Sequence, residues 1–203
     1  MKKILKSIYW SVVKVLSPSV YRTKGTAGPI TFKNLFVQKV IGINRCAYWP
    51  MHFTSKATGV KNIKIGIGTA PGLSPGCYIQ GKGKIFIGDY TIVGPNVGII
   101  SANHDKDDLT KYDIGDVRIG DYCWIGMNSV ILPNVVLGNN VVVGAGSVVT
   151  KSFEQGNVVI GGNPAKVIRT LDPITTPIKN KYEYYGYIKA SSFETFRKKK
   201  LSV

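Results

Sequence analysis

The sequence is poor in cysteine and histidine, and each shortage excludes a class of protein. Three cysteines are too few and too scattered for a disulfide framework or a zinc site, so a reduced, cytoplasmic setting is expected. Cys123 is expected to point into the core as a small hydrophobic residue. The two histidines, His52 and His104, lie far apart without a paired ligand spacing, so no metal is expected. His52 stands among aromatic residues and is expected to serve packing.

Acidic residues are also scarce. The chain has 11 Asp and Glu against 27 Lys and Arg, which gives a net charge of +16. This excess favours an anionic partner such as a phosphorylated cofactor, a nucleic acid or an acidic membrane surface, and a basic surface that serves only solubility is the alternative. No P-loop is present, because the nearest candidate, residues 81–84, lacks the required Ser or Thr context.

No apolar run is long enough to span a bilayer. The nearest candidate is residues 1–16, where Lys14 interrupts the apolar residues and no convincing cleavage site follows, so a signal peptide is not expected. A helix is predicted here. Packing against the body or a neighbouring subunit is the preferred interpretation, and peripheral contact with a membrane is the alternative. Residues 17–29, with Ser, Pro and Gly, read as a linker.

A six-residue repeat organises the rest of the chain. An aliphatic residue recurs at every sixth position, usually followed by Gly and with Asn or Asp nearby: Ile119, Ile125, Ile131, Leu137, Val143 and Val149. Neither the helical nor the strand period fits, so short strands joined by tight corners are expected, where Gly, Asn and Asp accept positive φ angles. Three steps close one coil of a triangular prism. The pattern therefore predicts an all-β fold, a parallel β-helix that buries the aliphatic residues.

The repeat is interrupted once. Ile99 and Ile119 are 20 residues apart, which is three steps plus two, so the register slips in the polar segment 103–118. A β-helix can extrude such a loop, and loops on rigid scaffolds often carry function. The predicted regions are an N-terminal helix and linker, a β-helix domain, and an aromatic, basic extension that packs over the last coil or extends beyond it: 1–29, 30–170 and 171–203.

His104 opens this loop and is the candidate catalytic base, flanked by Asn103 and Asp105 as further candidates. Imidazole titrates near neutral pH, so it can accept a proton from a hydroxyl group that hardly ionises by itself. An aspartate, Asp105, Asp107 or Asp108, is expected to hold the other ring nitrogen. The sequence does not say which of the three does so.

Basic residues gather where the repeat ends. Lys151 follows the last regular step, and Lys166 and Arg169 follow Asn163-Pro164-Ala165. Basic groups at the end of a prism could hold the phosphates of a cofactor that lies along its side. A solvated, basic end face is the alternative, and spacing alone does not decide between them.

Four motifs resemble those of the hexapeptide-repeat acyltransferases, and the pattern is most similar to bacterial polysaccharide O-acetyltransferases of the colanic-acid type. The motifs are ISANHD (100–105), IGDYCWIGMN (119–128), VGAGSVVTK (143–151) and GNPAKVIR (162–169). The resemblance covers most of residues 60–170. The histidine and the Gly-Asn-Pro-Ala closure are more specific to the family than the repeats are. The resemblance implies a left-handed β-helix, although parallel crossovers are overwhelmingly right-handed. It also implies a homotrimer with sites between neighbouring subunits, and acetyl-CoA as the donor.

The resemblance also implies roles for single residues. His104 matches the catalytic base of the family. The positions that line the pantetheine arm, largely through main-chain groups, match Trp124, Met127 and Ala145. The positions near the nucleotide match Thr150, Lys151, Lys166 and Arg169. The first 60 residues and the C-terminal extension fall outside the shared core, so acceptor recognition is not carried over.

The expected activity is therefore transfer of an acetyl group from acetyl-CoA to a hydroxyl group of a sugar or glycan. N-acetylation of an amino sugar is the nearest alternative. A metal enzyme similar to the gamma-type carbonic anhydrases is disfavoured, because it needs three imidazole ligands. A non-enzymatic basic solenoid that binds nucleic acid or acidic glycans stays open as a third class, although no nucleic acid partner is expected if the chain is an acetyltransferase.

Overall fold

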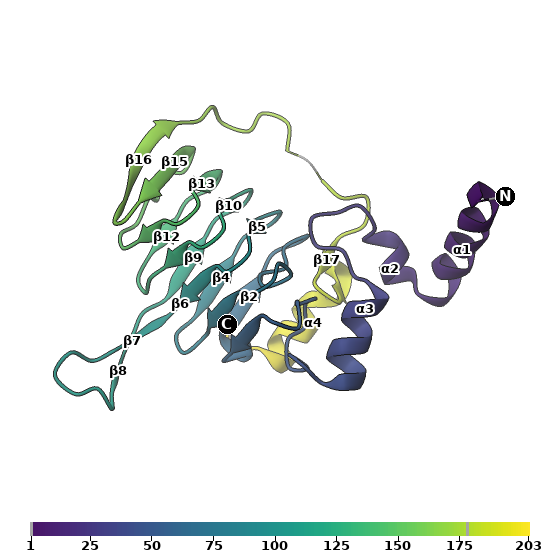
Figure 1. The fold of residues 1–203 in the computed structure, drawn as a ribbon, viewed down its shortest axis with the longest axis horizontal. Coiled ribbons are helices and arrows are strands. Elements are labelled where there is room, and N and C mark those ends of the chain that lie inside the picture. Colours follow the sequence, from purple (N-terminus) through teal and green to yellow (C-terminus); the bar gives the residue numbers. More distant parts are fainter. Residues whose placement is uncertain (1, 178) are drawn as a thin grey trace.

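The computed structural model describes residues 2–177 and 179–203, and its main body is a left-handed parallel β-helix with three faces (Figure 1). Sheet A contains β1 (Lys56–Thr58), β3 (Tyr78–Gln80), β6 (Gly98–Ile100), β11 (Val130–Ile131) and β14 (Val148–Val149). Sheet B contains β2 (Ile63–Ile65), β4 (Ile85–Ile87), β9 (Val117–Ile119) and β12 (Val136–Leu137). Sheet C contains β5 (Ile92–Val93), β10 (Trp124–Ile125), β13 (Val141–Val143), β15 (Val158–Gly162) and β16 (Ala165–Thr170). The parallel β-helix predicted from the repeat is confirmed.

The aliphatic residues of the repeat stack on one another inside the prism. Ile131 pairs with Ile99 in the coil before it and with Val149 in the coil after it, and all three side chains are fully buried. Burial of one such side chain stabilises the fold by roughly 1.5–3 kcal/mol. Each coil therefore contributes one or more buried aliphatic residues from every face to a continuous core.

The glycines that follow the aliphatic residues have a different role from the one the sequence suggested. Gly120, Gly126 and Gly138 do not have positive φ angles. A Cβ atom at Gly126 would instead lie 2.6 Å from the carbonyl oxygen of Val143, and one at Gly138 would lie 2.2 Å from that of Glu154. Glycine is required there because the main chain of the next coil comes too close for any side chain.

The positive φ angles occur two residues later, at the corners. Asn128 and Asn140 have φ angles of 59° and 55°, and Tyr122 has 56° at the equivalent place in another coil. Asparagine tolerates this conformation better than most residues. Tyr122 is held there by its ring, which stacks on Tyr90 with ring centroids 5.4 Å apart. The corner prediction was therefore right about asparagine, and the structure adds tyrosine.

Buried threonine hydroxyl groups join successive coils at the corner between sheets B and C. The Thr91 hydroxyl donates to the Gly120 carbonyl (2.8 Å) and accepts from the Cys123 amide (3.0 Å). One coil earlier, the Thr69 hydroxyl donates to the Gly88 carbonyl and accepts from the Thr91 amide. Cys123 itself is buried, as the sequence predicted, and burial raises the pKa of its thiol to about 11.

The chain ahead of the prism is helical. It contains α1 (Lys2–Leu16), α2 (Pro18–Arg22), α3 (Phe32–Leu35) and the π-helical turn η1 (Phe36–Ile41). The helix predicted over 1–16 is present from Lys2, and Met1 lies outside the described residues. The strands of the prism begin with β1 at Lys56. No helix among residues 2–177 and 179–203 is long and apolar enough to cross a membrane.

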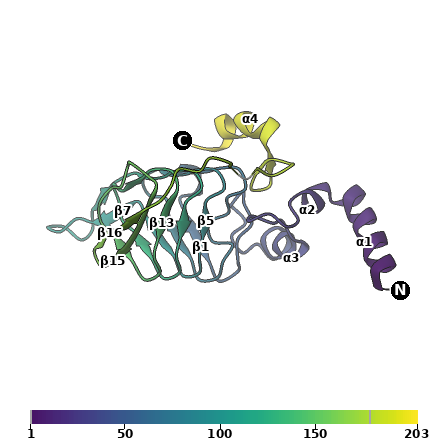
Figure 2. The ribbon, with the colours of Figure 1, turned by 90° about the horizontal axis from the view of Figure 1, so that it is seen from above.

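The C-terminal extension does not cover the last coil. It returns along the prism to the first coils, where the Ser202 amide donates to the Lys61 carbonyl and the Tyr187 amide donates to the Tyr48 carbonyl (Figures 1 and 2). Phe193 is buried in the same core as the first coils. The elements of the C-terminal extension are β17 (Tyr184–Tyr185), β18 (Ile188–Lys189) and α4 (Ala190–Lys200). The first coil also contains a short 3-10 turn, η2 (Val60–Asn62). Aromatic packing on the open first coil explains this course, because that end would otherwise expose apolar side chains.

The threonine ladder provides a test of how the coils are held together. Thr91→Val should lower the free energy of unfolding by about 1–3 kcal/mol, because the Gly120 carbonyl and the Cys123 amide lose their buried partner. Thr91→Ser keeps the hydroxyl group and should lose less. Urea unfolding followed by circular dichroism measures both variants, and wild-type stability of Thr91→Val would mean that the hydroxyl group of Thr91 does not hold the coils together.

Candidate active site

A two-stranded hairpin leaves the prism at the corner between sheets A and B. It consists of β7 (Ala102–His104) and β8 (Tyr112–Ile114), which pair antiparallel, and the prism resumes with β9 at Val117 (Figure 1). The register slip predicted over 103–118 therefore takes the form of an ordered hairpin that projects from the prism.

The base of the hairpin is fixed by a close approach to the preceding coil. Ser101 is fully buried, and its hydroxyl group donates to the Gln80 carbonyl (2.5 Å) and accepts from the Gly83 amide (2.9 Å). A Cβ atom at Gly83 would lie 2.9 Å from the Ser101 carbonyl oxygen. Residues 81–84 carry no phosphate-loop pattern, and they instead form the part of the preceding coil that packs against the base of the hairpin.

His104 lies exposed on β7 with one ring nitrogen bound by the main chain. Its Nδ1 is 2.7 Å from the Leu109 carbonyl oxygen. A carbonyl oxygen only accepts hydrogen bonds, so Nδ1 carries the proton, and in the neutral ring Nε2 keeps a free lone pair. The ring is also in contact with that of Tyr112, its cross-strand partner, with centroids 4.4 Å apart. His104 therefore has a fixed tautomer and presents Nε2 as a proton acceptor.

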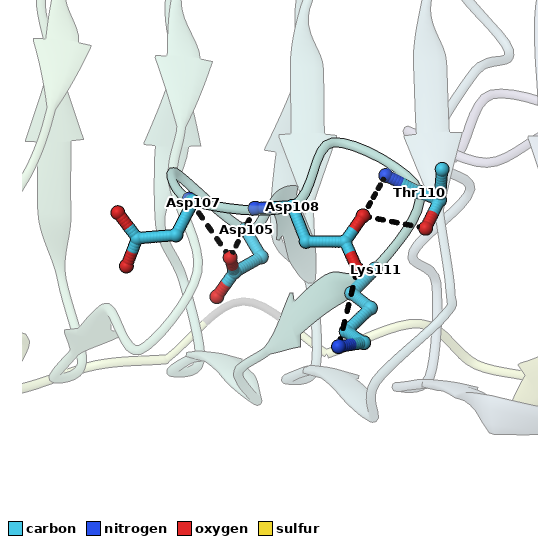
Figure 3. Close-up of polar contacts among 5 residues, drawn as sticks. All are labelled: Asp105, Asp107, Asp108, Thr110 and Lys111. Atoms are coloured by element: carbon cyan, nitrogen blue, oxygen red, sulfur yellow. Dashed lines mark hydrogen bonds and ion pairs between the residues drawn. The ribbon is translucent and has the colours of Figure 1, made fainter.

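The aspartates of the loop do not hold the His104 ring, which corrects the expectation that one of them would. The Asp105 carboxylate accepts from the amides of Asp107 (2.9 Å) and Asp108 (2.8 Å), and so closes the turn after β7 (Figure 3). Asp108 accepts from the Thr110 amide and hydroxyl and lies 3.1 Å from the Lys111 ammonium. These contacts hold the pKa of Asp108 below its usual value, and the hydrogen bond from the Thr110 hydroxyl has the largest effect.

The carboxylates therefore act on the loop, and the loop acts on the histidine. Asp105 and Asp108 fix the main chain on either side of Leu109, whose carbonyl oxygen holds the ring of His104. The carboxylate of Asp107 points away from the other loop contacts in Figure 3. Asn103, the other predicted neighbour, is exposed and faces Asp113 across the hairpin.

Two neighbours of His104 were missed by the sequence reasoning. The Lys82 ammonium, from the preceding coil, lies 3.2 Å from the centroid of the Tyr112 ring, which itself contacts His104. A cation this close to an aromatic face attracts the ring and restricts it. Both residues could have been found from the sequence, since Lys82 stands at the same corner one coil earlier and Tyr112 is where a hairpin from His104 would return.

The residues predicted to contact a cofactor occupy other parts of the prism. Trp124 is exposed on β10 of sheet C. Met127 and Ala145 lie in the turns that lead from sheet C into sheet A, and both are exposed. A Cβ atom at Gly146, next to Ala145, would meet nothing within 4 Å, so the space over this turn is open. These residues form one exposed strip, but it lies across the width of sheet A from the corner that carries His104.

The predicted basic residues are also divided. Thr150 and Lys151 follow β14 and lie at the corner between sheets A and B, on the same edge as the hairpin. Lys166 and Arg169 are exposed on β16, the antiparallel strand that closes sheet C. All four are available to an anionic ligand, but one chain does not bring them together. Among the described residues, no cluster of three or more His, Cys, Asp or Glu could hold a metal ion.

Comparison with known proteins points to one family. Residues 116–151 match the model "Bacterial transferase hexapeptide (six repeats)". A galactoside O-acetyltransferase of Escherichia coli is 36% identical over 113 residues, which is 53% of this chain and 52% of that protein. The chain spans about half the length of the curated relatives it matches.

Two solved structures share the fold. A maltose O-acetyltransferase from Clostridium difficile superposes with a TM-score of 0.59 at 26% identity, over 84% of this chain and 88% of that one. A galactoside acetyltransferase in complex with coenzyme A has a TM-score of 0.55 at 23% identity, over 93% of this chain and 88% of that one. None of these proteins is named as colanic-acid-specific, so that finer resemblance stays a prediction.

The role of Asp105 can be tested without any assumption about chemistry. Asp105→Ala should speed hydrogen exchange of the Asp107 and Asp108 amides by at least about tenfold, because both lose a charged acceptor. Asp105→Asn keeps a carbonyl oxygen at the same place and should restore most of the protection. Exchange measured by nuclear magnetic resonance gives both values. If the Asn variant exchanges as fast as the Ala variant, the negative charge of Asp105, not its geometry, orders the loop.

Proposed function

The chain belongs to the hexapeptide-repeat acetyltransferase family, and from this we propose that it transfers an acetyl group from acetyl-CoA to a hydroxyl group of a sugar or glycan. The observation that carries the proposal is His104, exposed on a projecting hairpin with Nδ1 bound to the Leu109 carbonyl and Nε2 free to accept a proton. Sugar hydroxyl groups need such a base, because they hardly ionise near neutral pH.

The proposed reaction is a direct transfer. His104 Nε2 takes the proton of the acceptor hydroxyl while its oxygen forms a bond to the acetyl carbonyl carbon. The bond between that carbon and sulfur then breaks, and the leaving thiolate takes the proton from the imidazolium, so that an ester and CoA are the products. The Leu109 carbonyl, bonded to Nδ1–H, stabilises the transient positive charge on the ring.

The remaining predicted residues fit a bound CoA. Exposed Trp124 and Met127 and the open turn at Ala145 suit the narrow, mostly apolar pantetheine arm. Lys151, Lys166 and Arg169 would supply positive charge for the phosphates. A main-chain amide beside the thioester would stabilise the oxyanion.

The division of these residues over two edges of the prism supports a shared site. His104 lies at the edge between sheets A and B, whereas Met127 and Ala145 lie at the edge between sheets C and A. Packing the first edge of one chain against the second edge of another brings the two sets together. Such a contact is head-to-tail, and its repetition gives a closed ring where the rotation between neighbours returns the last chain to the first. We propose that the ring is a homotrimer.

The role of His104 is tested by turnover. His104→Ala should reduce acetyl-CoA consumption by at least about a hundredfold, because the general base is lost. A panel of sugars, glycans and amino sugars serves as acceptors and also separates oxygen from nitrogen acceptors. His52→Ala is the matched control, since the ring of the other histidine lies outside the hairpin and contacts Phe53 and Thr54. Near wild-type turnover by His104→Ala would remove His104 as the base.

The shared site is tested by mixing two inactive variants. His104→Ala lacks the base, and Ala145→Trp fills the open turn proposed for the pantetheine arm. If each site uses His104 from one chain and Ala145 from the next, random rings formed after co-refolding should regain about a quarter of wild-type turnover. If both residues belonged to one chain's site, mixing would restore nothing, and the shared site would be wrong.

A further inference from the structure

The positive charge of the chain is concentrated at one end of the molecule. Residues 1–88 contain 14 Lys and Arg and no acidic residue, and the first acidic residue of the chain is Asp89. The other 115 residues carry 13 Lys and Arg against 11 Asp and Glu. The helices α1, α2 and α3 and the first coils all belong to the basic part, so the helical end of the molecule has no acidic residue of its own segment to neutralise it (Figure 1).

Helix α1 exposes a wide apolar stripe at this end. Its exposed apolar residues are between 49% and 76% accessible and follow helical spacing: Leu5, Ile8, Tyr9, Val12, Val15 and Leu16. The opposite side of the helix attaches it to the body, where Val13 is buried against Val20 and Ile30, and Trp10 packs beside them. The preferred expectation was packing against the body or a neighbouring subunit, and the contact with the body is confirmed for this narrow side. The wide stripe is free, and α1 projects beyond the prism in both views (Figures 1 and 2).

A second exposed apolar stripe lies on the next helical segment. Phe32, Phe36 and Val40 are four residues apart along α3 and η1, and each is about half exposed or more. Lys33 and Lys39 lie on the same segment. Burial and the nearby Arg45 lower the pKa of Lys39. Two helical segments that are close in sequence thus combine exposed apolar side chains with positive charge.

We propose that this helical end, with α1 as its main contact, docks on the surface of an anionic lipid bilayer. An amphipathic, basic helix that is too short to span a membrane lies in the interface, with its apolar face among the upper acyl chains and its basic groups at the phosphates. A second copy of this chain is disfavoured as the occupant, because it would bring another segment of 14 cations and no anions against the first. A bilayer rich in anionic lipid supplies the opposite charge.

The proposal goes beyond the proposed acetyl transfer and does not depend on it. It is tested by co-sedimentation of the full chain with vesicles. Binding is expected to vesicles of equal parts phosphatidylcholine and phosphatidylglycerol, and to be much weaker with phosphatidylcholine alone. Raising the salt concentration from about 0.1 M to about 0.5 M should weaken binding, because the charges are then screened within a few ångströms. No sedimentation with the anionic vesicles would overturn the proposal.

Three double variants locate the surface. Ile8→Ser with Val12→Ser should weaken binding at least about tenfold through the loss of apolar area. Ile168→Ser with Ile174→Ser makes the same change at exposed positions outside the helical end and should bind as wild type. Lys6→Gln with Lys14→Gln should cost about fivefold per charge. Equal binding by the Ile8 and Val12 variant and by wild type would mean that α1 is not the contact.

Two further readouts separate this proposal from its alternatives. If α1 instead joins subunits, light scattering will show the Ile8→Ser, Val12→Ser variant losing mass while vesicle binding is unchanged, which would overturn the proposal. Turnover with a free sugar acceptor should be the same in that variant as in wild type. His104→Ala, in contrast, should keep vesicle binding. The two proposals can therefore fail separately.

Discussion

The stacking of aliphatic side chains along the prism is the interaction on which the rest of the structure depends. Each coil closes only because residues such as Ile125, Ile131 and Leu137 turn inward on three different faces and meet their counterparts above and below. Strands of two or three residues are too short to be stable alone. Parallel pairing between coils, repeated on every face, makes them stable together. The corners are less constrained than the faces, so insertions such as the hairpin are found there.

The corners show how tightly that stacking constrains the sequence. Glycine follows the aliphatic residue because the next coil approaches within contact distance, and asparagine occupies the positive φ position two residues later. Polar side chains at the corners then bond from coil to coil, as Asp89, Asp121 and Asn139 do by accepting amides at 2.7–2.8 Å. Burial raises the pKa of Asp89, which means that burial disfavours the charged carboxylate at this corner. An asparagine at the same place can accept the same hydrogen bond without a charge.

The hairpin uses the one freedom that the stacking leaves. A corner can be lengthened without moving the axis, provided that both ends of the insertion return to the same place, and the bond from the Gly115 amide to the Ser101 carbonyl closes that gap (3.0 Å). The hairpin carries four aspartates and two lysines, which makes it acidic within a basic protein. The carboxylates of the hairpin order its turn. The ordered turn places the Leu109 carbonyl against Nδ1 of His104, and this contact fixes the tautomer of the ring. The ring of His104 is thus linked to the scaffold through main-chain contacts.

The sequence by itself determined the repeat, the prism, the buried Cys123 and the place of the insertion, because a six-residue period leaves few other ways to bury its aliphatic residues. It also singled out His104. Tertiary structure decided the rest. The partner of the His104 ring is the Leu109 carbonyl, which no residue pattern reveals, since every residue has a carbonyl group. The C-terminal extension returns to the first coil because that end is where apolar surface is open. The candidate residues separate onto two edges because chain order around a triangle, not distance along the sequence, sets which side chains meet.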